Sequence, residues 1–178
     1  MPKTDAFFIR AQVAASAADQ YFEAEIPLGS FVDVMANSVL RILNIEGEWA
    51  CGPNSTGNEV GAPPTMASNQ AGDATWQLCT QTQAALVGLN NKQVIGKGQL
   101  WARNPDGSVN SPTQVHTDSH LPQHYSEGYL VATESIYLGA LRSDDWELAD
   151  DMVFNIVLEC QVEKLDAKKG MALALSQQ

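Results

Sequence analysis

The sequence predicts an all-β protein: an antiparallel β-sandwich, a jelly roll of about eight strands with little helix. Three observations predict this class. Apolar and polar residues alternate over long segments, as in strands that bury one face. Helical patterns do not separate these segments, which argues against a parallel sheet. Several segments exceed ten residues, which favours two sheets packed face to face. An immunoglobulin-like sandwich is the second choice, because its Cys…Trp…Cys core signature is missing.

The clearest strand covers 152–163. Apolar side chains stand there at every second position: Met152, Phe154, Ile156, Leu158, Cys160 and Val162. The intervening residues include Asn155, Glu159, Gln161 and Glu163. A period of two over this length predicts one buried and one mostly solvated face.

The other elements follow in chain order from similar patterns and from turn signals. Strands are predicted at 6–14, 22–28, 38–50, 75–82, 94–103 and 128–141. Segment 31–35 is interpreted as a short strand or a single helical turn, and segment 83–89 as one or two helical turns. The segments 52–73 and 104–126 are expected to be long loops, because Gly, Pro and polar residues dominate them.

Finer features are expected at three places. Gly96 and Gly98 predict a bulge or bend within 94–103. Asp166 is a candidate N-cap for a short helix at 167–176. The strands at 128–141 and 152–163 are expected to form a long hairpin near the centre of one sheet.

Size and charge restrict the function. The 178 residues are most simply one jelly-roll domain, 1–178. Ten Lys and Arg oppose 21 Asp and Glu, for a net charge of −11, and the only adjacent basic pair is Lys168-Lys169. Direct contact with a genome is therefore not expected. Membrane insertion is not expected either, because no stretch approaches the ~18 apolar residues that a span needs.

Cysteine usage favours a reducing setting. Cys51, Cys79 and Cys160 are far apart and match no CxxC metal pattern. Cys160 falls on the apolar face of the predicted strand at 152–163, as a small core residue would. The N-terminal residues do not resemble a signal peptide, so export by the usual route is not expected.

All three histidines lie in one short stretch, His116, His120 and His124, with Asp118 between the first two. Imidazoles and a carboxylate are the usual ligands of zinc, iron or copper. A cupin-type enzyme, however, uses a His-x-His pair, a Glu and a distal His, and this chain has no other histidine. A solvated or interface loop is therefore the favoured interpretation, and the four residues stay weak metal candidates. No metal or other cofactor is expected.

Other chemistry has weaker support. The carboxylates of 144–151 lack the spacing of a calcium loop and are interpreted as a solvated acidic turn. Glu134 and Glu159 fall mid-strand, where a polar surface explains them better than a glycosidase pair. The four tryptophans, Trp49, Trp76, Trp101 and Trp146, could line a sugar platform, although core packing is the default for such residues. No catalytic residue is assigned, and the protein is not expected to be an enzyme or to use a small-molecule substrate.

Three segments carry a resemblance to a known family: 22–29 (FEAEIPLG), 39–46 (VLRILNIE) and 146–159 (WELADDMVFNIVLE). In these segments, and in strand order and length over most of the chain, the sequence resembles the single jelly-roll major capsid proteins of icosahedral prokaryotic viruses, bacterial or archaeal. The resemblance includes no diagnostic motif.

The resemblance implies a structural protein that self-assembles into a viral shell, as a major or minor capsid protein. Its partners would be copies of itself and other capsid proteins, joined through loops and termini. Such shells often enclose an internal membrane, so the chain would lie in the virion, near that membrane, after assembly in the host cytoplasm. Two alternatives stay open: a metal-dependent cupin-like enzyme that uses the histidines of 116–124, and a carbohydrate-binding β-sandwich module.

Overall fold

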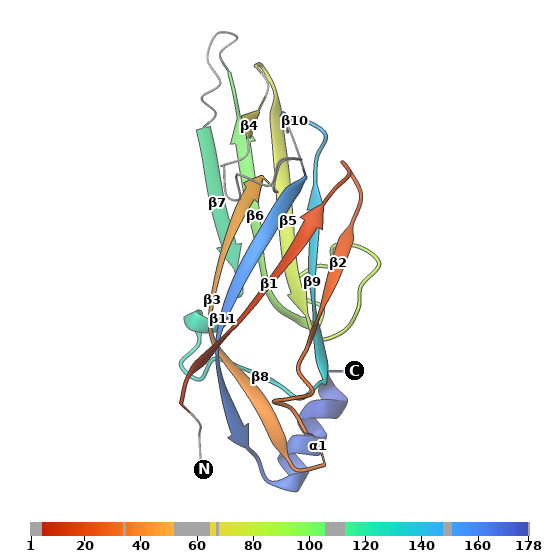
Figure 1. The fold of residues 1–178 in the computed structure, drawn as a ribbon, viewed down its shortest axis with the longest axis vertical. Helices are drawn as coiled ribbons and strands as arrows, with labels where there is room; N and C mark the ends of the chain where they lie inside the picture. The colour runs from red at the N-terminus through yellow and green to blue at the C-terminus, as the bar shows by residue number, and fades with distance from the viewer. Residues whose placement is uncertain are drawn as a thin grey trace.

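A computed structural model describes residues 5–33, 35–51, 65–66, 68–105, 113–147 and 151–177 (Figure 1). Its elements are β1 (Phe7–Ala15), β2 (Phe22–Pro27), β3 (Ser38–Cys51), β4 (Thr65–Met66), β5 (Ala71–Cys79), β6 (Val94–Arg103), β7 (Thr113–Ser119), the 3-10 turn η1 (Pro122–His124), β8 (Tyr129–Val131), β9 (Ser135–Arg142), β10 (Trp146–Glu147), β11 (Met152–Lys164) and α1 (Ala167–Ser176). Nearly all regular structure in the described residues is therefore β-strand.

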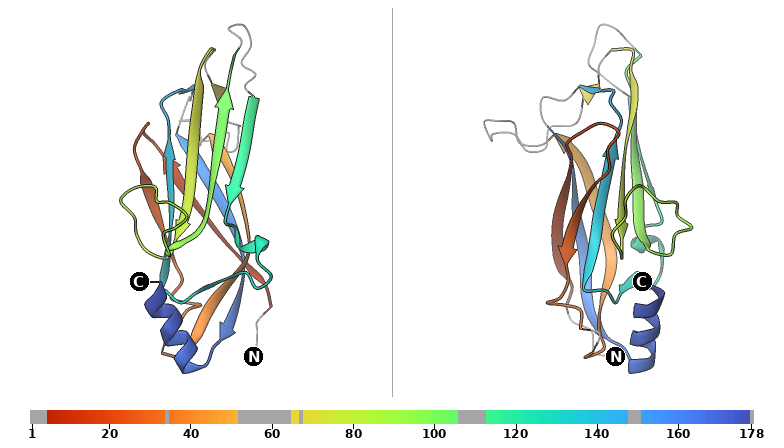
Figure 2. Two further views of the ribbon diagram at one scale, coloured as in Figure 1. Left: turned by 180° about the vertical axis from the view of Figure 1, so that it is seen from behind. Right: turned by 90° about the vertical axis from the view of Figure 1, so that its right-hand side faces the viewer.

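Two antiparallel sheets face each other, as Figure 2 shows from the side. Sheet A has the order β1-β11-β3-β8, and sheet B has the order β2-β9-β5-β6-β7. Leaving aside β4, β7 and β10, the strands pair first with last (β1 with β11) and then inward: β2 with β9, β3 with β8 and β5 with β6. This nested pairing is what results when one long antiparallel ribbon wraps into two sheets. The fold is a jelly roll, as the sequence predicted.

The strand predicted at 152–163 is confirmed as β11, between β1 and β3 in sheet A. Its side chains from Met152 through Cys160 at every second position are at most 1% exposed. The partner strand β3 has a bulge at Leu43, because Glu159 pairs with Asn44 while the next residue pairs with Ile42. A bulge inserts one residue and reverses the alternation. The residues of β3 that face the core are therefore even-numbered up to Ile42 and odd-numbered from Ile45 onward.

Aromatic rings fill the space between the sheets. The Phe154 ring stacks on Trp76, with centroids 4.8 Å apart, and meets Trp49 at 5.0 Å. Two glycines make room for these rings. A Cβ at Gly47 would lie 2.3 Å from Cζ of Phe154, and one at Gly98 would lie 2.3 Å from Nε1 of Trp76. Both positions therefore exclude larger side chains while the rings keep their places.

The prediction of one continuous strand at 128–141 is wrong. It is two strands in different sheets: β8 pairs with β3 in sheet A, and β9 pairs with β2 and β5 in sheet B. The chain crosses between sheets at 132–134, where the Glu134 carbonyl accepts a hydrogen bond from the Leu28 amide. The expected hairpin of 128–141 with 152–163 is therefore wrong too, because β9 and β11 lie in opposite layers.

Three smaller predictions are also corrected. In segment 31–35 the described residues form a turn with one bridge, Asp33 to Ser38, and neither a strand nor a helix. Segment 83–89 has no helix. The loop predicted at 104–126 contains β7 and η1, and the loop predicted at 52–73 contains β4 and the start of β5. Positions 52–64, 67, 106–112 and 148–150 lie outside the described residues.

Two finer predictions are confirmed. The pairing of β5 with β6 shifts register between Leu78 and Cys79, which places a bulge beside Gly96. The helix α1 begins after Asp166, whose carboxylate accepts a hydrogen bond from the Lys169 amide at 2.9 Å. The helix lies at the end of the sandwich where β3 starts and β11 stops (Figure 1). Among the described helices, none is long and apolar enough to cross a membrane.

Candidate functional site

The first two candidate ligands lie on β7, at the margin of sheet B. β7 pairs with β6 from Lys97↔Ser119 to Arg103↔Thr113. His116 and Asp118 point to the same face because they are two residues apart, and His116 Nδ1 lies 3.7 Å from Asp118 Oδ2. Their side chains are 37% and 33% exposed. Together they form a partly exposed polar pair on a strand.

The other two histidines face different neighbours. His120 follows β7 with a positive φ of 59° and shares a 2.7 Å hydrogen bond between its Nδ1 and the Tyr125 hydroxyl. His124 ends η1 and is exposed. No group of three or more His, Cys, Asp or Glu side chains within metal-binding reach occurs among the described residues. The three histidines of 116–124 therefore point to different neighbours on the surface and do not form a cluster.

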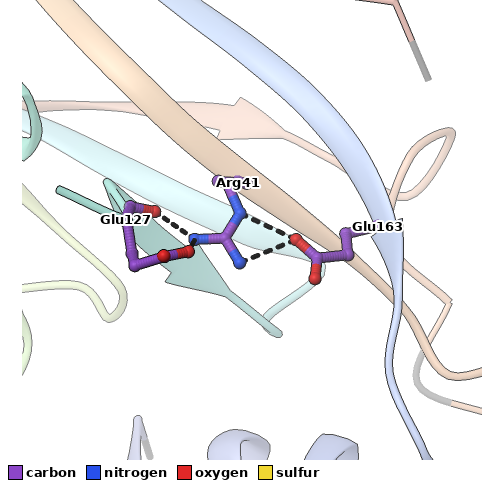
Figure 3. A network of polar contacts seen from close by, with 3 residues as sticks. All are labelled: Arg41, Glu127 and Glu163. Carbon is purple, nitrogen blue, oxygen red and sulfur yellow. Dashed lines mark hydrogen bonds and ion pairs between the residues drawn. The ribbon is translucent and has the colours of Figure 1, made fainter. Parts of the chain in front are cut away.

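A buried ion pair that sequence reasoning missed joins β3 to β11 and contacts the segment just before β8. Arg41 of β3 holds one carboxylate oxygen of Glu163 through Nε and Nη2, each at 2.7 Å, and its Nη1 donates to the Glu127 carbonyl just before β8 (Figure 3). The Glu127 carboxylate lies 3.7 Å from Nη1. Arg41 and Glu163 are only 8% and 7% exposed, whereas Glu127 is 79% exposed. This geometry positions β8 against the rest of sheet A.

An open groove of about 600 Å³ lies between this network and α1. Its lining includes Arg41, Tyr129, Leu130 and Leu173. Gln177 closes one side of the groove: its amide nitrogen donates to the Leu130 carbonyl, and its amide oxygen accepts from the Ala132 amide at 2.9 Å. The Gln177 side chain thereby pairs with β8 as another strand would. Burial raises the pKa of Tyr129 in the groove wall.

A second buried polar network holds loop 80–93 on sheet B. Gln77 is fully buried, and its side-chain amide bonds to the Ala85 carbonyl, the Val87 amide and the Tyr21 hydroxyl. The Lys97 ammonium also donates to the Val87 carbonyl, at 2.9 Å. Burial raises the pKa of Tyr21 well above its usual value. These side chains replace the backbone bonds of the helix that the sequence predicted at 83–89.

Most of the tryptophans and cysteines considered from the sequence lie in the core. Trp49, Trp76 and Trp146 are at most 7% exposed, whereas Trp101 is 43% exposed on sheet B. Burial raises the pKa of the Cys79 thiol and of the Cys160 thiol to about 12 each. Both thiols are therefore inert at neutral pH.

Comparisons with known proteins found a weak structural likeness. No family model matches the chain, and no curated protein matches it. Similar solved structures include VP1 of Trichodysplasia spinulosa-associated polyomavirus in complex with GM1 oligosaccharide (12% identity, 90% of this chain and 94% of that chain, TM-score 0.38). They also include the unassembled VP1 pentamers of KI polyomavirus (13%, 90% and 95%, TM-score 0.40) and of the R198K mutant from Washington University polyomavirus (10%, 90% and 93%, TM-score 0.42).

These proteins are viral capsid proteins, the broad class that the sequence resemblance named, but their viruses are eukaryotic and not prokaryotic. At these identities and TM-scores the likeness supports no argument about function. The jelly-roll assignment depends instead on the strand pairing of this chain itself.

Proposed function

We propose that this chain is a structural protein that self-assembles into a viral capsid shell. Jelly rolls serve mainly as viral capsid proteins, lectin domains and cupin enzymes. One observation supports the first of these: the interior is filled by packed rings and aliphatic chains, including the fully buried Trp76 and Phe154.

The cupin alternative places its metal inside the barrel. Here Phe154 and its neighbours occupy that space, and His116 and Asp118 lie on a strand at the margin of sheet B. The histidines of 116–124 therefore do not converge on an internal site. This arrangement favours a surface role for them.

The carbohydrate-binding alternative needs an exposed aromatic platform. Three of the four tryptophans pack in the core, which leaves Trp101 with the smaller Val115 beside it. A single exposed ring offers little stacking area for a sugar. We therefore do not advance this function for the chain.

The finer parts of the proposal follow from the sequence resemblance. The chain forms one domain, 1–178, of a shell protein from a prokaryotic virus, and it has no catalytic role. Its partners are copies of itself and other capsid proteins in the virion. The net charge of −11 argues against direct contact with the genome, because nucleic-acid phosphates are also negative.

Electron microscopy and light scattering of the purified full-length chain test the proposal. We expect closed particles of uniform diameter, with a mass that is a large multiple of the 19.2 kDa chain. Protein concentration and salt should be varied, because contacts between acidic subunits depend on charge screening. A chain that stays monomeric under every condition would contradict the proposal.

A further inference from the structure

Among the described strands, β7 lies at one edge of sheet B. It pairs with β6 on one side, and no described strand pairs with its other side. Every residue from Gln114 to Ser119 is exposed, so both faces of the strand meet solvent. An edge strand carries a row of backbone groups that can pair with another strand. β7 is therefore a ready template for one more strand.

The side chains of β7 are complementary to a second copy of the same strand, because an imidazole N–H can donate a hydrogen bond to a carboxylate. Consider two β7 strands from two copies, paired antiparallel and centred on Thr117. Each residue then faces the residue of the second copy for which the two residue numbers add to 234. His116 then faces Asp118 of the second copy, and Asp118 faces the partner's His116. Opposite charges directly across a strand pair stabilise it, and like charges destabilise it. One register thus satisfies both copies at once.

Other registers lose this match. Centring the pair on His116 places the two imidazoles opposite each other, and centring it on Asp118 places the two carboxylates opposite each other. The favoured register also places Val115 against Ser119 of the second copy, on the face that carries Trp101. A two-fold contact of this kind is self-complementary, as homo-oligomeric interfaces are.

We propose that β7 pairs antiparallel with β7 of a second copy about a two-fold axis at Thr117, joining two copies of sheet B into one continuous sheet. This inference depends on the proposed function, because it names one contact through which subunits of the shell would join. The competing explanation is that His116 and Asp118 protect an exposed edge from pairing, as charges on edge strands often do.

Charge-swap variants separate the two explanations. The variants are His116→Asp, Asp118→Lys and the double variant that carries both. In the proposed register His116→Asp places two carboxylates opposite each other, and Asp118→Lys removes the carboxylate that accepts a hydrogen bond from His116. The double variant places an introduced Asp opposite an introduced Lys. In a one-to-one mixture of the two single variants, the mixed dimer pairs the introduced Asp with the introduced Lys and pairs Asp118 with His116. The matched control is Glu48→Lys, which makes the same change of charge as Asp118→Lys at an exposed site on β3.

Sedimentation velocity of the full chain measures the dimer dissociation constant. We expect each single variant to raise this constant at least tenfold, while the double variant, the mixture and the Glu48→Lys control stay within about threefold of the wild-type chain. Single variants that dimerise as well as the wild type would overturn the pairing. So would a double variant that fails to recover while its thermal unfolding matches that of the wild type.

Electron microscopy of the same samples distinguishes this inference from the proposed function. If both single variants form the same particles as the wild type, the β7 pairing is wrong, whereas the proposed capsid function is still supported. A wild-type dimer that never forms particles supports the pairing and contradicts the shell. A wild-type chain that remains monomeric overturns both.

Discussion

Gly47→Ala is a direct test of the packing between the sheets. The added Cβ would lie 2.3 Å from Cζ of Phe154 and 3.0 and 3.1 Å from its two Cε atoms. Ordinary carbon contacts need about 3.5 Å, so the ring has to withdraw by roughly 1 Å. Trp76 at 4.8 Å and Trp49 at 5.0 Å occupy the space behind it. The strain therefore spreads into three rings.

We expect this variant to lower the free energy of unfolding by about 2 to 3 kcal/mol, the upper part of the range for overpacked cores. For a chain of this size that corresponds to a loss of roughly 4 to 12 °C in Tm. The matched control is Gly29→Ala, because no atom lies within 4 Å of a Cβ at that position. The control should change the free energy of unfolding by at most about 0.5 kcal/mol.

Denaturant unfolding of the unassembled chain measures both variants. Phe154→Leu should partly suppress the effect of Gly47→Ala, since it removes the ring carbons that clash. The double variant should then be more stable than the sum of the two single changes predicts, by about 1 kcal/mol or more. Equal stability of the Gly47→Ala and Gly29→Ala variants would refute this account of the core.

Three further predictions concern the buried groups and the helix cap. Arg41→Met leaves the Glu163 carboxylate buried beside an apolar side chain and should cost about 3 to 5 kcal/mol in the free energy of unfolding, whereas Arg41→Met with Glu163→Leu should cost far less; equal losses in urea unfolding would show that the ion pair is not the cause. Because burial raises the pKa values of Cys79 and Cys160 to about 12, a thiol reagent at pH 8 should modify at most one cysteine per folded chain and three per unfolded chain; two fast-reacting thiols in the folded chain would contradict their burial. The Lys169 amide lowers the pKa of Asp166 below its ordinary value, so the stabilisation by this cap is complete above that value, about 3.9, and is lost as pH falls through the lower folded pKa; the Tm difference between wild type and Asp166→Ala should stay constant from pH 7 to 5 and shrink in more acidic buffer, and a difference that shrinks already above pH 5 would argue against the cap.

Sequence patterns predicted the structure correctly where a single local pattern decides it. The alternation in 152–163 predicted β11 because burial of one face imposes a period of two. Asp166 predicted the start of α1 because a carboxylate there satisfies an orphan amide of the first turn. Gly96 indicated the β-bulge in its vicinity, since irregular strands accept glycine readily.

The same signals failed where the chain does not bury one face regularly. β7 was expected to be loop because it is exposed on both faces, so its sequence has no hydrophobic period to read. The bulge at Leu43 reverses the alternation of β3, which explains why 38–50 alternates poorly in the sequence. The turns expected at 83–89 form no helix, since buried Gln77 bonds their backbone instead. The Arg41–Glu163 pair had no sequence signal, because 122 positions separate its members.

By itself, the sequence determined that the protein is an antiparallel β-sandwich, that 152–163 is a long strand with one buried face, and where the terminal helix begins. Only the tertiary structure decided which strands are neighbours, that 128–141 divides between two sheets, and that His116 and Asp118 lie on the last described strand of sheet B. The physical reason is that a period of two reports one buried face and nothing about the strand alongside. Neighbours are chosen by hydrogen bonds and packing between distant segments, which no local pattern encodes.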